Sequence, residues 1–300
     1  MTTILRTWLI TGICRGLGRT LAQAALRRGD RVIGTTRSGD SDLQPNPYLE
    51  VLKMDVADPE QIRAAMRIVR GRCRLDVVVN NAGYGLIGAV EELTTPQVYE
   101  MFAANFFGCF HVLQEVLPLL RAQRSGRIIN ISSASALAPP PGFGLYCASK
   151  TALEAMSEAL AQELAPLGIH LSIVEPGQLR PDFLTTCSVQ YARRSIADYA
   201  ASSGRIVERL HQADGLQPGN PEAAAQAILD LADTESPPLR LLLGSDALHR
   251  ARNTLAQTIS EIDRWEDLTR SVDYVADVGA QRKLTQGAQR KVTHLVELKA

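Results

Sequence analysis

Short apolar runs alternate along the chain with longer stretches in which apolar residues recur every three or four positions. The short runs are rich in Val, Ile and Leu and predict buried β-strands, whereas the longer periodic stretches predict helices. Strands are expected over residues 5–10, 31–35, 48–54, 75–79, 127–131, 170–174 and 239–243. Helices are expected over residues 17–28, 59–69, 96–121, 150–164, 221–232 and 247–268. This alternation predicts an α/β fold with a doubly wound parallel sheet that has helices on both faces.

The alternation is interrupted at residues 178–219 and again beyond residue 246. No internal repeat and no low-complexity linker marks the start of a second domain. We therefore expect a single domain over residues 1–246, followed by a C-terminal helical extension and a polar tail over residues 247–300. Pro118 lies inside a predicted helix and indicates a bend or break there.

Charge and composition narrow the possible functions. Lys+Arg and Asp+Glu both number 32, so the formal net charge is +0, which argues against a partner such as nucleic acid or an anionic membrane. The five scattered cysteines form no CxxC pair and no Cys/His pair with metal-ligand spacing, so we expect no metal and no disulfide framework. The apolar run at residues 8–10 is too short for a signal peptide or a membrane span. We expect a cytoplasmic protein.

The first predicted strand runs directly into the sequence Thr11-Gly12-Ile13-Cys14-Arg15-Gly16-Leu17-Gly18. Glycines let the backbone approach a pyrophosphate closely, and the helix that follows presents N–H groups and the positive end of its dipole to that anion. A glycine cluster also occurs in ordinary tight turns, but this one lies between the first strand and the first helix, where a Rossmann fold binds dinucleotides. We predict contacts to a dinucleotide from Gly12, Arg15, Gly16, Leu17 and Gly18.

Two arginines indicate which dinucleotide binds. Arg15 lies inside the turn, and Arg37 follows the second strand, where Thr36 replaces the Asp or Glu that usually holds the ribose of NAD. An acid would repel a 2′-phosphate, whereas guanidinium groups bind one through charge-assisted hydrogen bonds. Both arginines could instead be solvated surface charges, but their positions favour NADP(H) over NAD(H).

Tyr146 and Lys150 are four residues apart, so on a helix their side chains lie on one face, one turn apart. A phenol has an ordinary pKa of about 10, and an adjacent ammonium group lowers that pKa by stabilising the phenolate. The spacing also fits a pair of surface residues. As a functional pair, it makes Tyr146 a candidate general acid or base for hydride transfer.

Further residues, in one order and one register, make the chain resemble the classical short-chain dehydrogenase/reductase family over about residues 5–245. The matching positions are Thr11-Gly12, Gly16-Leu17-Gly18, Asp55-Val56, Asn80-Asn81-Ala82-Gly83, Asn105, Ser132-Ser133, Tyr146, Lys150 and Pro176-Gly177. The resemblance implies a Rossmann fold and an oxidoreductase that acts on a carbonyl or an alcohol with NAD(P).

The resemblance also implies a role for each matching residue. Tyr146 is implied as the acid/base, Lys150 as the group that lowers its pKa and binds the nicotinamide ribose, and Ser133 as the donor to the substrate oxygen. Asn105 is implied to sit at a break in its helix and to hold a water that relays protons to Lys150. The other implied coenzyme contacts are Asp55 and Val56 at the adenine, Asn81, Ala82 and Gly83 at the adenosine, and Pro176, Gly177 and Leu179 at the nicotinamide.

Structural alternatives remain open for several of these residues. Ser133 and Asp55 could cap helices, Asn105 could satisfy backbone groups at a kink, and Asn80 and Asn81 could tie neighbouring strands together. Ser132 is adjacent to Ser133, but the family's spacing of thirteen residues before the tyrosine favours Ser133.

Pro181 departs from the family pattern Pro-Gly-x-x-x-Thr, in which the threonine binds the nicotinamide carboxamide. Proline offers neither a side-chain donor nor a backbone N–H. The carboxamide would then depend on backbone groups near Leu179, with Arg180 or Asp182 as candidates to help.

The resemblance places a substrate lid at about residues 178–219. Phe183 of this lid, together with Tyr84 and Phe143 on the opposite wall, is expected to line the substrate site beside Ser133 and Tyr146. An apolar pocket favours a ketone or secondary alcohol on a steroid-, retinoid-, lipid- or secondary-metabolite-like body, as in a ketoreductase.

Two other functions stay open: an epimerase or dehydratase on the same scaffold, and a non-catalytic regulator that senses NADP(H). Regulators of that kind tend to lose the tyrosine or the lysine, and this chain has both. The apolar helices at residues 96–120 and 150–164 predict a homodimer or homotetramer.

Overall fold

The computed structural model describes residues 5–71, 74–180, 188–212 and 215–274. The chain divides into two compact units, residues 1–253 and residues 254–300, which we describe separately. The predicted boundary after residue 246 remains a prediction.

Seven parallel strands form the central sheet of the first unit, in the order β3-β2-β1-β4-β6-β7-β9. They are β1 (Thr7–Thr11), β2 (Arg31–Thr36), β3 (Leu49–Lys53), β4 (Val77–Asn80), β6 (Gly126–Ile131), β7 (Ile169–Pro176) and β9 (Arg240–Leu243). Leu9 of β1 pairs with Ile33 of β2 on one side and with Val78 of β4 on the other. This sheet confirms the predicted α/β fold. Its order changes direction between β1 and β4, and sheets of this kind bind ligands in the crevice at that point.

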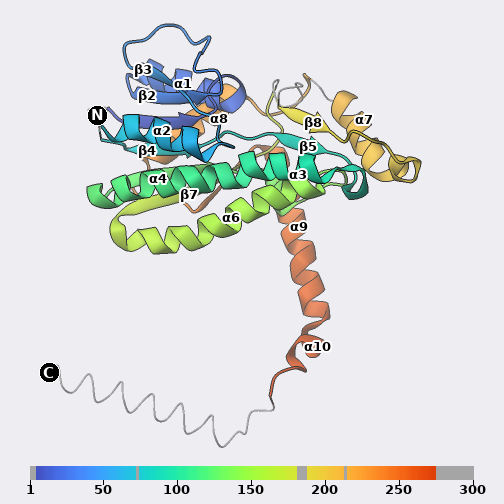
Figure 1. Cartoon of the computed structure of the whole chain (residues 1–300). Coiled ribbons are helices and arrows are strands. Elements are labelled where there is room, and N and C mark those ends of the chain that lie inside the picture. Colours follow the sequence, from blue (N-terminus) through green and yellow to red (C-terminus); the bar gives the residue numbers. More distant parts are fainter. Residues whose placement is uncertain (1–4, 72–73, 181–187, 213–214, 275–300) are drawn as a thin grey trace, which may run out of the picture. The chain divides into compact units, whose positions relative to one another are not determined.

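Helices cover both faces of the sheet (Figure 1), and alternate side chains of the central strands enter two separate cores, one on each face. Trp8 and Ile10 of β1 pack on the face covered by α1 and α8, whereas Leu9 packs on the face covered by α2, α4 and α6. These helices are α1 (Gly16–Arg28), α2 (Pro59–Arg70), α4 (Gly108–Gln123), α6 (Gly144–Leu164) and α8 (Pro221–Asp233). Burying each such apolar side chain contributes about 1.5–3 kcal/mol, so both faces favour Val, Ile and Leu.

Two helix boundaries can be compared with the predicted ones. Helix α1 ends at Gly29, whose φ of 94° lies in the left-handed region that glycine tolerates, as the sequence predicted. Helix α6 begins at Gly144, before the predicted start at residue 150, so that Tyr146 and Lys150 lie on the same helix.

The long helical region before β6 is interrupted around Asn105, where the family resemblance implied a break, and not at Pro118. Helix α3 (Thr95–Phe102) passes into a π-helical segment, Ala103–Phe107, and then into α4. Helix α4 continues through Pro118, so of the predicted bend or break at that residue the break is wrong and the bend stays a prediction. The wide turn is centred on Asn105 instead.

A smaller layer lies beyond the carboxyl ends of the main strands. Strands β5 (Gly85–Ile87) and β8 (Val189–Tyr191) pair in parallel, and they pack with α3 and α7 (Arg205–Gln212) around a third core. The short helix α5 (Ala134–Leu137) connects β6 to the loop before α6. Of the predicted lid at 178–219, residues 181–187 and 213–214 lie outside the described residues.

Helix α9 (Ser245–Arg264) begins in the first unit, where Ala247 and Ala251 are buried, and continues into the second. Within the second unit it is followed by α10 (Glu266–Arg270), so the helix predicted over residues 247–268 is divided at Trp265. Residues beyond 274, including the polar tail, lie outside the described residues.

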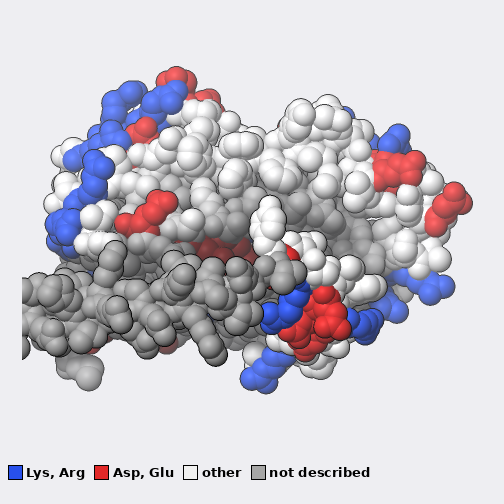
Figure 2. Space-filling view, turned by 90° about the horizontal axis from the view of Figure 1, so that it is seen from below, with Lys and Arg blue, Asp and Glu red and all other residues white. Residues whose placement is uncertain are grey.

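The stretch Thr95–Gln123 is long and apolar enough to cross a membrane by length and composition alone. One side of it is buried in the first unit, with Val112, Leu113 and Val116 in the core beneath the sheet. Figure 2 shows basic and acidic side chains beside one another on the visible face, without a continuous basic surface.

Candidate active site

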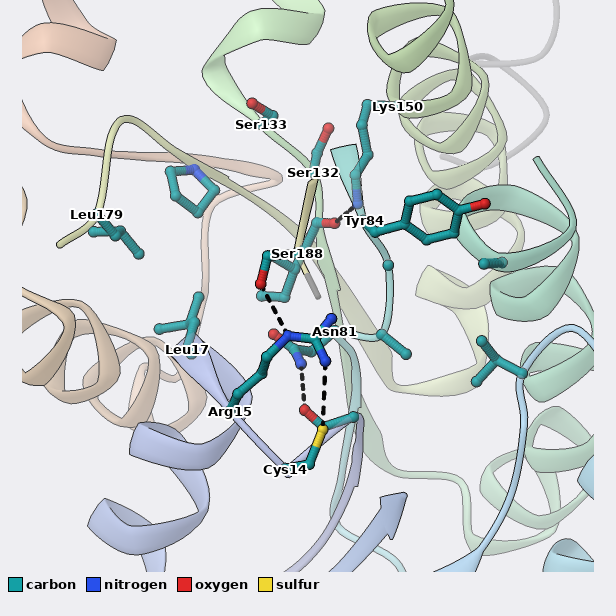
Figure 3. Close-up of a pocket in the computed structure, with 18 of the residues that line it drawn as sticks. Cys14, Arg15, Leu17, Asn81, Tyr84, Ser132, Ser133, Lys150, Leu179 and Ser188 are labelled. Carbon is teal, nitrogen blue, oxygen red and sulfur yellow. Dashed lines mark hydrogen bonds between the residues drawn. The ribbon is translucent and has the colours of Figure 1, made fainter. Parts of the chain in front are cut away.

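A cavity of about 630 Å³ opens at the carboxyl ends of the central strands. The predicted site residues that line it are Gly12, Arg15, Gly16, Leu17, Thr36, Arg37, Asp55, Val56, Asn81, Ala82, Gly83, Tyr84, Ser133, Tyr146, Lys150, Pro176, Gly177 and Leu179. Several of them face one another across the space in Figure 3. The fold therefore brings these distant segments together around one cavity. Gly18, Asn105 and Phe143 do not line it, and Phe183 lies outside the described residues.

The turn between β1 and α1 is shaped by close backbone contacts. Gly12 and Gly16 have φ values of 74° and 55°, and the Gly12 N–H donates to the carbonyl oxygen of Thr35 in β2 at 3.0 Å. A Cβ atom on Gly18 would lie 2.3 Å from Asn81 Nδ2 and 2.4 Å from the Gly12 oxygen. Gly18 is therefore needed for packing within the turn, although it does not face the cavity.

The two predicted phosphate-binding arginines differ in their surroundings. Arg37 is exposed at the end of β2, and no ion pair among the described residues involves it. It is close enough to Tyr84 to lower the pKa of that phenol, although burial is the larger effect and raises the pKa to about 12. Arg15 instead donates from Nε to Ser188 Oγ at 2.9 Å, across the cavity mouth (Figure 3).

Other predicted coenzyme contacts also carry structural bonds. The Thr36 hydroxyl donates to the Asp40 carbonyl oxygen at 2.9 Å and so shapes the turn after β2. Asn81 Nδ2 donates to the carbonyl oxygens of Thr11 and Gly12 at 2.9 and 3.1 Å, which fixes β4 to the glycine turn. The cap of α2 is Asp58, not Asp55, so the capping alternative for Asp55 is wrong.

The structure distinguishes the two adjacent serines. Ser132 is buried, and its hydroxyl donates to Glu154 Oε1 at 2.5 Å. Ser133 caps α5 by accepting the Ser135 N–H at 3.2 Å, and its side chain also hydrogen-bonds Tyr146. Ser133 is thus the serine next to the phenol, as the family spacing implied, and it is a helix cap as well.

Tyr146 and Lys150 are both buried where α6 passes the end of β6. Burial raises the pKa of Tyr146 to about 12, an effect that the Ser133 hydrogen bond opposes in part. Burial also lowers the pKa of Lys150 to about 8, while its Nζ donates to the Ile131 carbonyl oxygen at 2.8 Å. The predicted lowering of the tyrosine pKa is therefore wrong for the protein by itself, because burial outweighs it.

Asn105 lies in the π-helical segment, so its predicted place at a helix break agrees with the structure. Both atoms of its side-chain amide bond the Tyr84 backbone: Oδ1 accepts the Tyr84 N–H, and Nδ2 donates to the Tyr84 carbonyl oxygen, both at 2.9 Å. Nδ2 is also 3.1 Å from Ser149 Oγ. The side chain thus satisfies backbone groups, as the structural alternative held.

The strand end at Pro176 and Gly177 is braced from two sides. The Gly177 N–H donates to the Leu243 carbonyl oxygen at 2.8 Å, and the Gln178 N–H donates to Asp246 Oδ2 at 3.0 Å. Leu179 bridges to Gly219, and the Arg180 N–H donates to the Gly219 oxygen at 2.9 Å. This segment is therefore held in place without a hydroxyl at position 181. Pro181 and Asp182 lie outside the described residues.

The predicted substrate wall is present only in part. Tyr84 lines the cavity, whereas Phe143 is buried behind it with its ring centroid 6.2 Å from that of Tyr146. The sequence reasoning missed Glu100, Ser188 and Gln190, which also line the cavity. They belong to no motif, and only the alternation in β8, with Val189 buried and Gln190 exposed, could have indicated Gln190.

Comparisons with known proteins agree with this geometry. Residues 6–191 match the family model described as short chain dehydrogenase. Oxidoreductase BOA17 of Botryotinia fuckeliana is 34% identical over 270 residues, which cover 88% of this chain and 98% of the relative. The 3-ketodihydrosphingosine reductase of Bacteroides thetaiotaomicron is 35% identical over 240 residues, covering 79% and 87%.

Two solved structures are also similar. A short-chain dehydrogenase from Streptomyces avermitilis is 36% identical with a TM-score of 0.82, covering 91% of this chain and all of that one. ElxO with NADP bound is 26% identical with a TM-score of 0.67, covering 82% of this chain and all of its own. The chain therefore belongs to the short-chain dehydrogenase/reductase family of oxidoreductases.

Proposed function

We propose that the protein is an NADP(H)-dependent oxidoreductase that transfers a hydride between the nicotinamide and a carbonyl or secondary alcohol on an apolar substrate. The observation that carries this proposal is the convergence of Ser133, Tyr146 and Lys150 on the cavity that the glycine turn also lines. A proton donor, a hydroxyl beside it and a phosphate-binding turn are what carbonyl reduction by a nicotinamide coenzyme requires.

The residues at the cavity fit a dinucleotide. Gly12 and Gly16 of the turn line the cavity with no side chain, which leaves room for a pyrophosphate, and Asp55, Val56 and Ala82 line the adenosine side. Arg37 offers a guanidinium group at the end of β2, and no ion pair among the described residues involves it. This supports binding of a 2′-phosphate and hence NADP(H) over NAD(H). When bound, the nicotinamide supplies or accepts the hydride.

Tyr146 would donate its phenolic proton to the carbonyl oxygen during reduction and recover it during oxidation, while Ser133 hydrogen-bonds the same oxygen. A pKa of about 12 leaves the phenol protonated at neutral pH, which suits the reductive direction. Lys150, as an ammonium ion, would stabilise the phenolate that remains. Because the Asn105 amide is bound to Tyr84, a water that relays protons to Lys150 would be held by the Asn105 main-chain carbonyl.

An apolar substrate is supported by the aromatic and aliphatic side chains that line the cavity, among them Tyr84, Ile131 and Leu179. The relative named for reducing a 3-keto sphingoid base makes a long-chain ketone the first substrate class to test. Exposed Phe107, at the end of the π-helical segment, and exposed Phe110 on α4 support a homodimer or homotetramer, and we keep the prediction of a cytoplasmic location.

The test is a panel of ketones with NADPH, and of alcohols with NADP⁺, that includes long-chain 3-keto bases. We expect NADPH oxidation with an apolar ketone, and we expect Tyr146→Phe to lower turnover by at least about 100-fold, the usual effect of losing a general acid. NADPH binding, followed by its fluorescence, should survive. Tyr99→Phe is the matched control, because Tyr99 is 71% exposed. Full turnover in Tyr146→Phe would rule out the proposed mechanism.

A further inference from the structure

A buried ionic cluster lies directly behind Ser132 and Lys150. Arg240, at the start of β9, donates to Glu154 Oε2 of α6 at 2.7 Å, to Glu175 of β7 and to Glu158 of α6. Glu154 and Glu175 have side chains that are 4% and 0% exposed, whereas that of Glu158 is 45% exposed. Ser132, directly after β6, also donates to Glu154, so the cluster joins the ends of three strands to α6.

The strand register explains why these groups meet. Arg240 pairs with Ile173 of β7, and Ile173 belongs to the core that α6 covers. Side chains alternate along a strand, so Glu175 points to the same face as Ile173 and Arg240. Glu154 follows Lys150 by four residues on α6 and therefore lies one helical turn from it. A buried carboxylate destabilises the fold unless a cation or a hydrogen-bond donor pairs with it, and Arg240 is that partner for Glu154 and Glu175.

We propose that Glu154 is a positioning residue of the active site: held by Arg240, its carboxylate fixes the Ser132 hydroxyl and places a negative charge one helical turn from Lys150, which keeps that lysine in its ammonium form. The effect on chemistry rests on the proposed function, because only an ammonium ion stabilises the phenolate of Tyr146. The electrostatic coupling of Glu154 to Lys150 does not depend on it.

The groups around Lys150 make Glu154 the charge that matters. Cys109 of α4 and Glu154 both favour the charged lysine, against the dominant effect of burial. Burial raises the pKa of Cys109 to about 12, so this thiol is neutral at pH 7. Tyr146 is protonated at that pH, and Ile131 contributes only a carbonyl oxygen. Among these groups of the described residues, Glu154 is therefore the carboxylate beside Lys150.

Glu175 and Glu154 differ in how fully their side chains are hydrogen-bonded within the cluster. Burial, and next the nearby Glu154, raise the pKa of Glu175, whose Oε2 has no hydrogen-bond partner among the described residues. A proton taken up by the cluster is thus favoured at Glu175. Glu154 accepts two hydrogen bonds, from the Ser132 hydroxyl and from the Arg240 guanidinium group, and these hold its carboxylate in place.

The test measures the titration of Lys150 directly. The chain has only five lysines (Lys53, Lys150, Lys283, Lys291 and Lys299), so ¹³C-labelling at lysine Cε gives a simple NMR spectrum in which Lys150→Met assigns the signal. We expect a pKa of about 8 in the starting protein. In Glu154→Gln, we expect it to fall by about one pH unit, because one nearby charge is lost while the shape is kept.

Two variants serve as controls. Glu158→Gln removes a charge from the same helix and the same arginine but farther from Lys150, and it should leave the titration unchanged. Glu154→Asp keeps the charge, so it should restore most of the shift even if the shorter side chain weakens the Ser132 contact. An unchanged Lys150 titration in Glu154→Gln, or equal shifts in Glu154→Gln and Glu158→Gln, would overturn the proposal.

Activity is a separate readout. If the proposed function holds, the alkaline limb of the kcat profile should move to lower pH in Glu154→Gln by the same amount as the NMR titration, with NADPH affinity unchanged. A shifted titration without any turnover on the ketone panel would preserve the coupling and reject the proposed function. Turnover on the ketone panel with an unchanged Lys150 titration would support the proposed function and reject the coupling of Glu154 to Lys150.

Discussion

The two ends of the cavity are built differently. At one end, around Gly12, Gly18 and Asn81, main-chain atoms and one side-chain amide give the cavity its shape. At the other end, around Tyr84, Ser188 and Gln190, side chains form the wall. We call these the turn end and the lid end. At the turn end, a misplaced methyl group would lie 2.3 Å from its neighbour. The lid end is built on a two-stranded sheet and short helices, and Tyr84 there keeps its backbone fixed by Asn105 while its ring faces the cavity. Backbone geometry tolerates few residue types, whereas a side-chain wall tolerates many. This difference accounts for the family motif at the turn end, and we expect substrate specificity to be set at the lid end.

Lys150 lies between the two ends, and its burial predicts the largest effect. Its pKa of about 8 in the folded protein lies below the ordinary value of 10.5, so between these pH values the unfolded chain retains a proton that the native lysine has lost. Stability therefore rises with pH across this window. We expect the unfolding free energy of the starting protein, minus that of Lys150→Met, to increase by about 3 kcal/mol from pH 8 to pH 10.5.

The measurement is denaturant unfolding over a series of pH values. Tyr146 is present in both proteins, so its own titration cancels in the difference. Lys53→Met is the control, because Lys53 is exposed and should give a flat difference. A flat difference for Lys150→Met would show that the lysine keeps its ordinary pKa.

Gly18→Ala tests the turn end. The added methyl group would overlap Asn81 Nδ2 and the Gly12 oxygen, and relieving that overlap should cost about 1–3 kcal/mol. We expect NADPH affinity to fall about 10- to 100-fold in a fluorescence titration. Gly71→Ala is the matched control, because its nearest neighbours would be 3.8 Å away. Unchanged affinity in Gly18→Ala would show that the turn is less rigid than the contacts indicate.

Arg37→Ala tests the choice of coenzyme at the same end. Loss of a charge-assisted contact to the 2′-phosphate should weaken NADPH binding about 10-fold and leave NADH binding unchanged. Arg31→Ala, at the other end of β2 and equally exposed, should change neither affinity. If Arg37→Ala preserves the preference for NADPH, Arg37 does not contact the phosphate.

Tyr84→Phe should have the smallest effect. Its ring remains and only the hydroxyl is lost, so we expect a change in KM for the ketone of about two- to threefold and no change in NADPH affinity. The readout is steady-state kinetics across the ketone panel. A loss of NADPH affinity would show that the two ends are not separate, which would contradict the comparison.

The sequence predicted the turn end well because its motif encodes backbone geometry. A positive φ at Gly12 and contact distances at Gly18 require glycine, and the alternation of strands and helices places this turn at the sheet's edge. The lid end was predicted poorly, since β5 and β8 are three residues long and carry no period that can be read. Phe143 was also predicted in the wrong place, because an aromatic side chain fits a cavity wall and a buried core equally well.

Other differences arise from tertiary contacts that no local pattern contains. The tyrosine pKa depends on how completely Tyr146 is buried, and a helical spacing gives no information on burial. The bond from Ser132 to Glu154 joins residues 22 positions apart, and it decides which of two adjacent serines faces the phenol. The break in the helical region follows the Asn105 contact to Tyr84 and not the position of Pro118.

The wide turn at Ala103–Phe107 also restricts how this part of the chain can change in length. Before it, Met101 faces the third core; after it, Val112 and Val116 face the core beneath the sheet. Each residue of a helix turns the next by about 100°, so deleting one residue between these contacts would rotate one half against the other and expose one set of side chains. Homologous chains should therefore vary freely in loop length elsewhere, yet keep the number of residues between positions 101 and 112 constant.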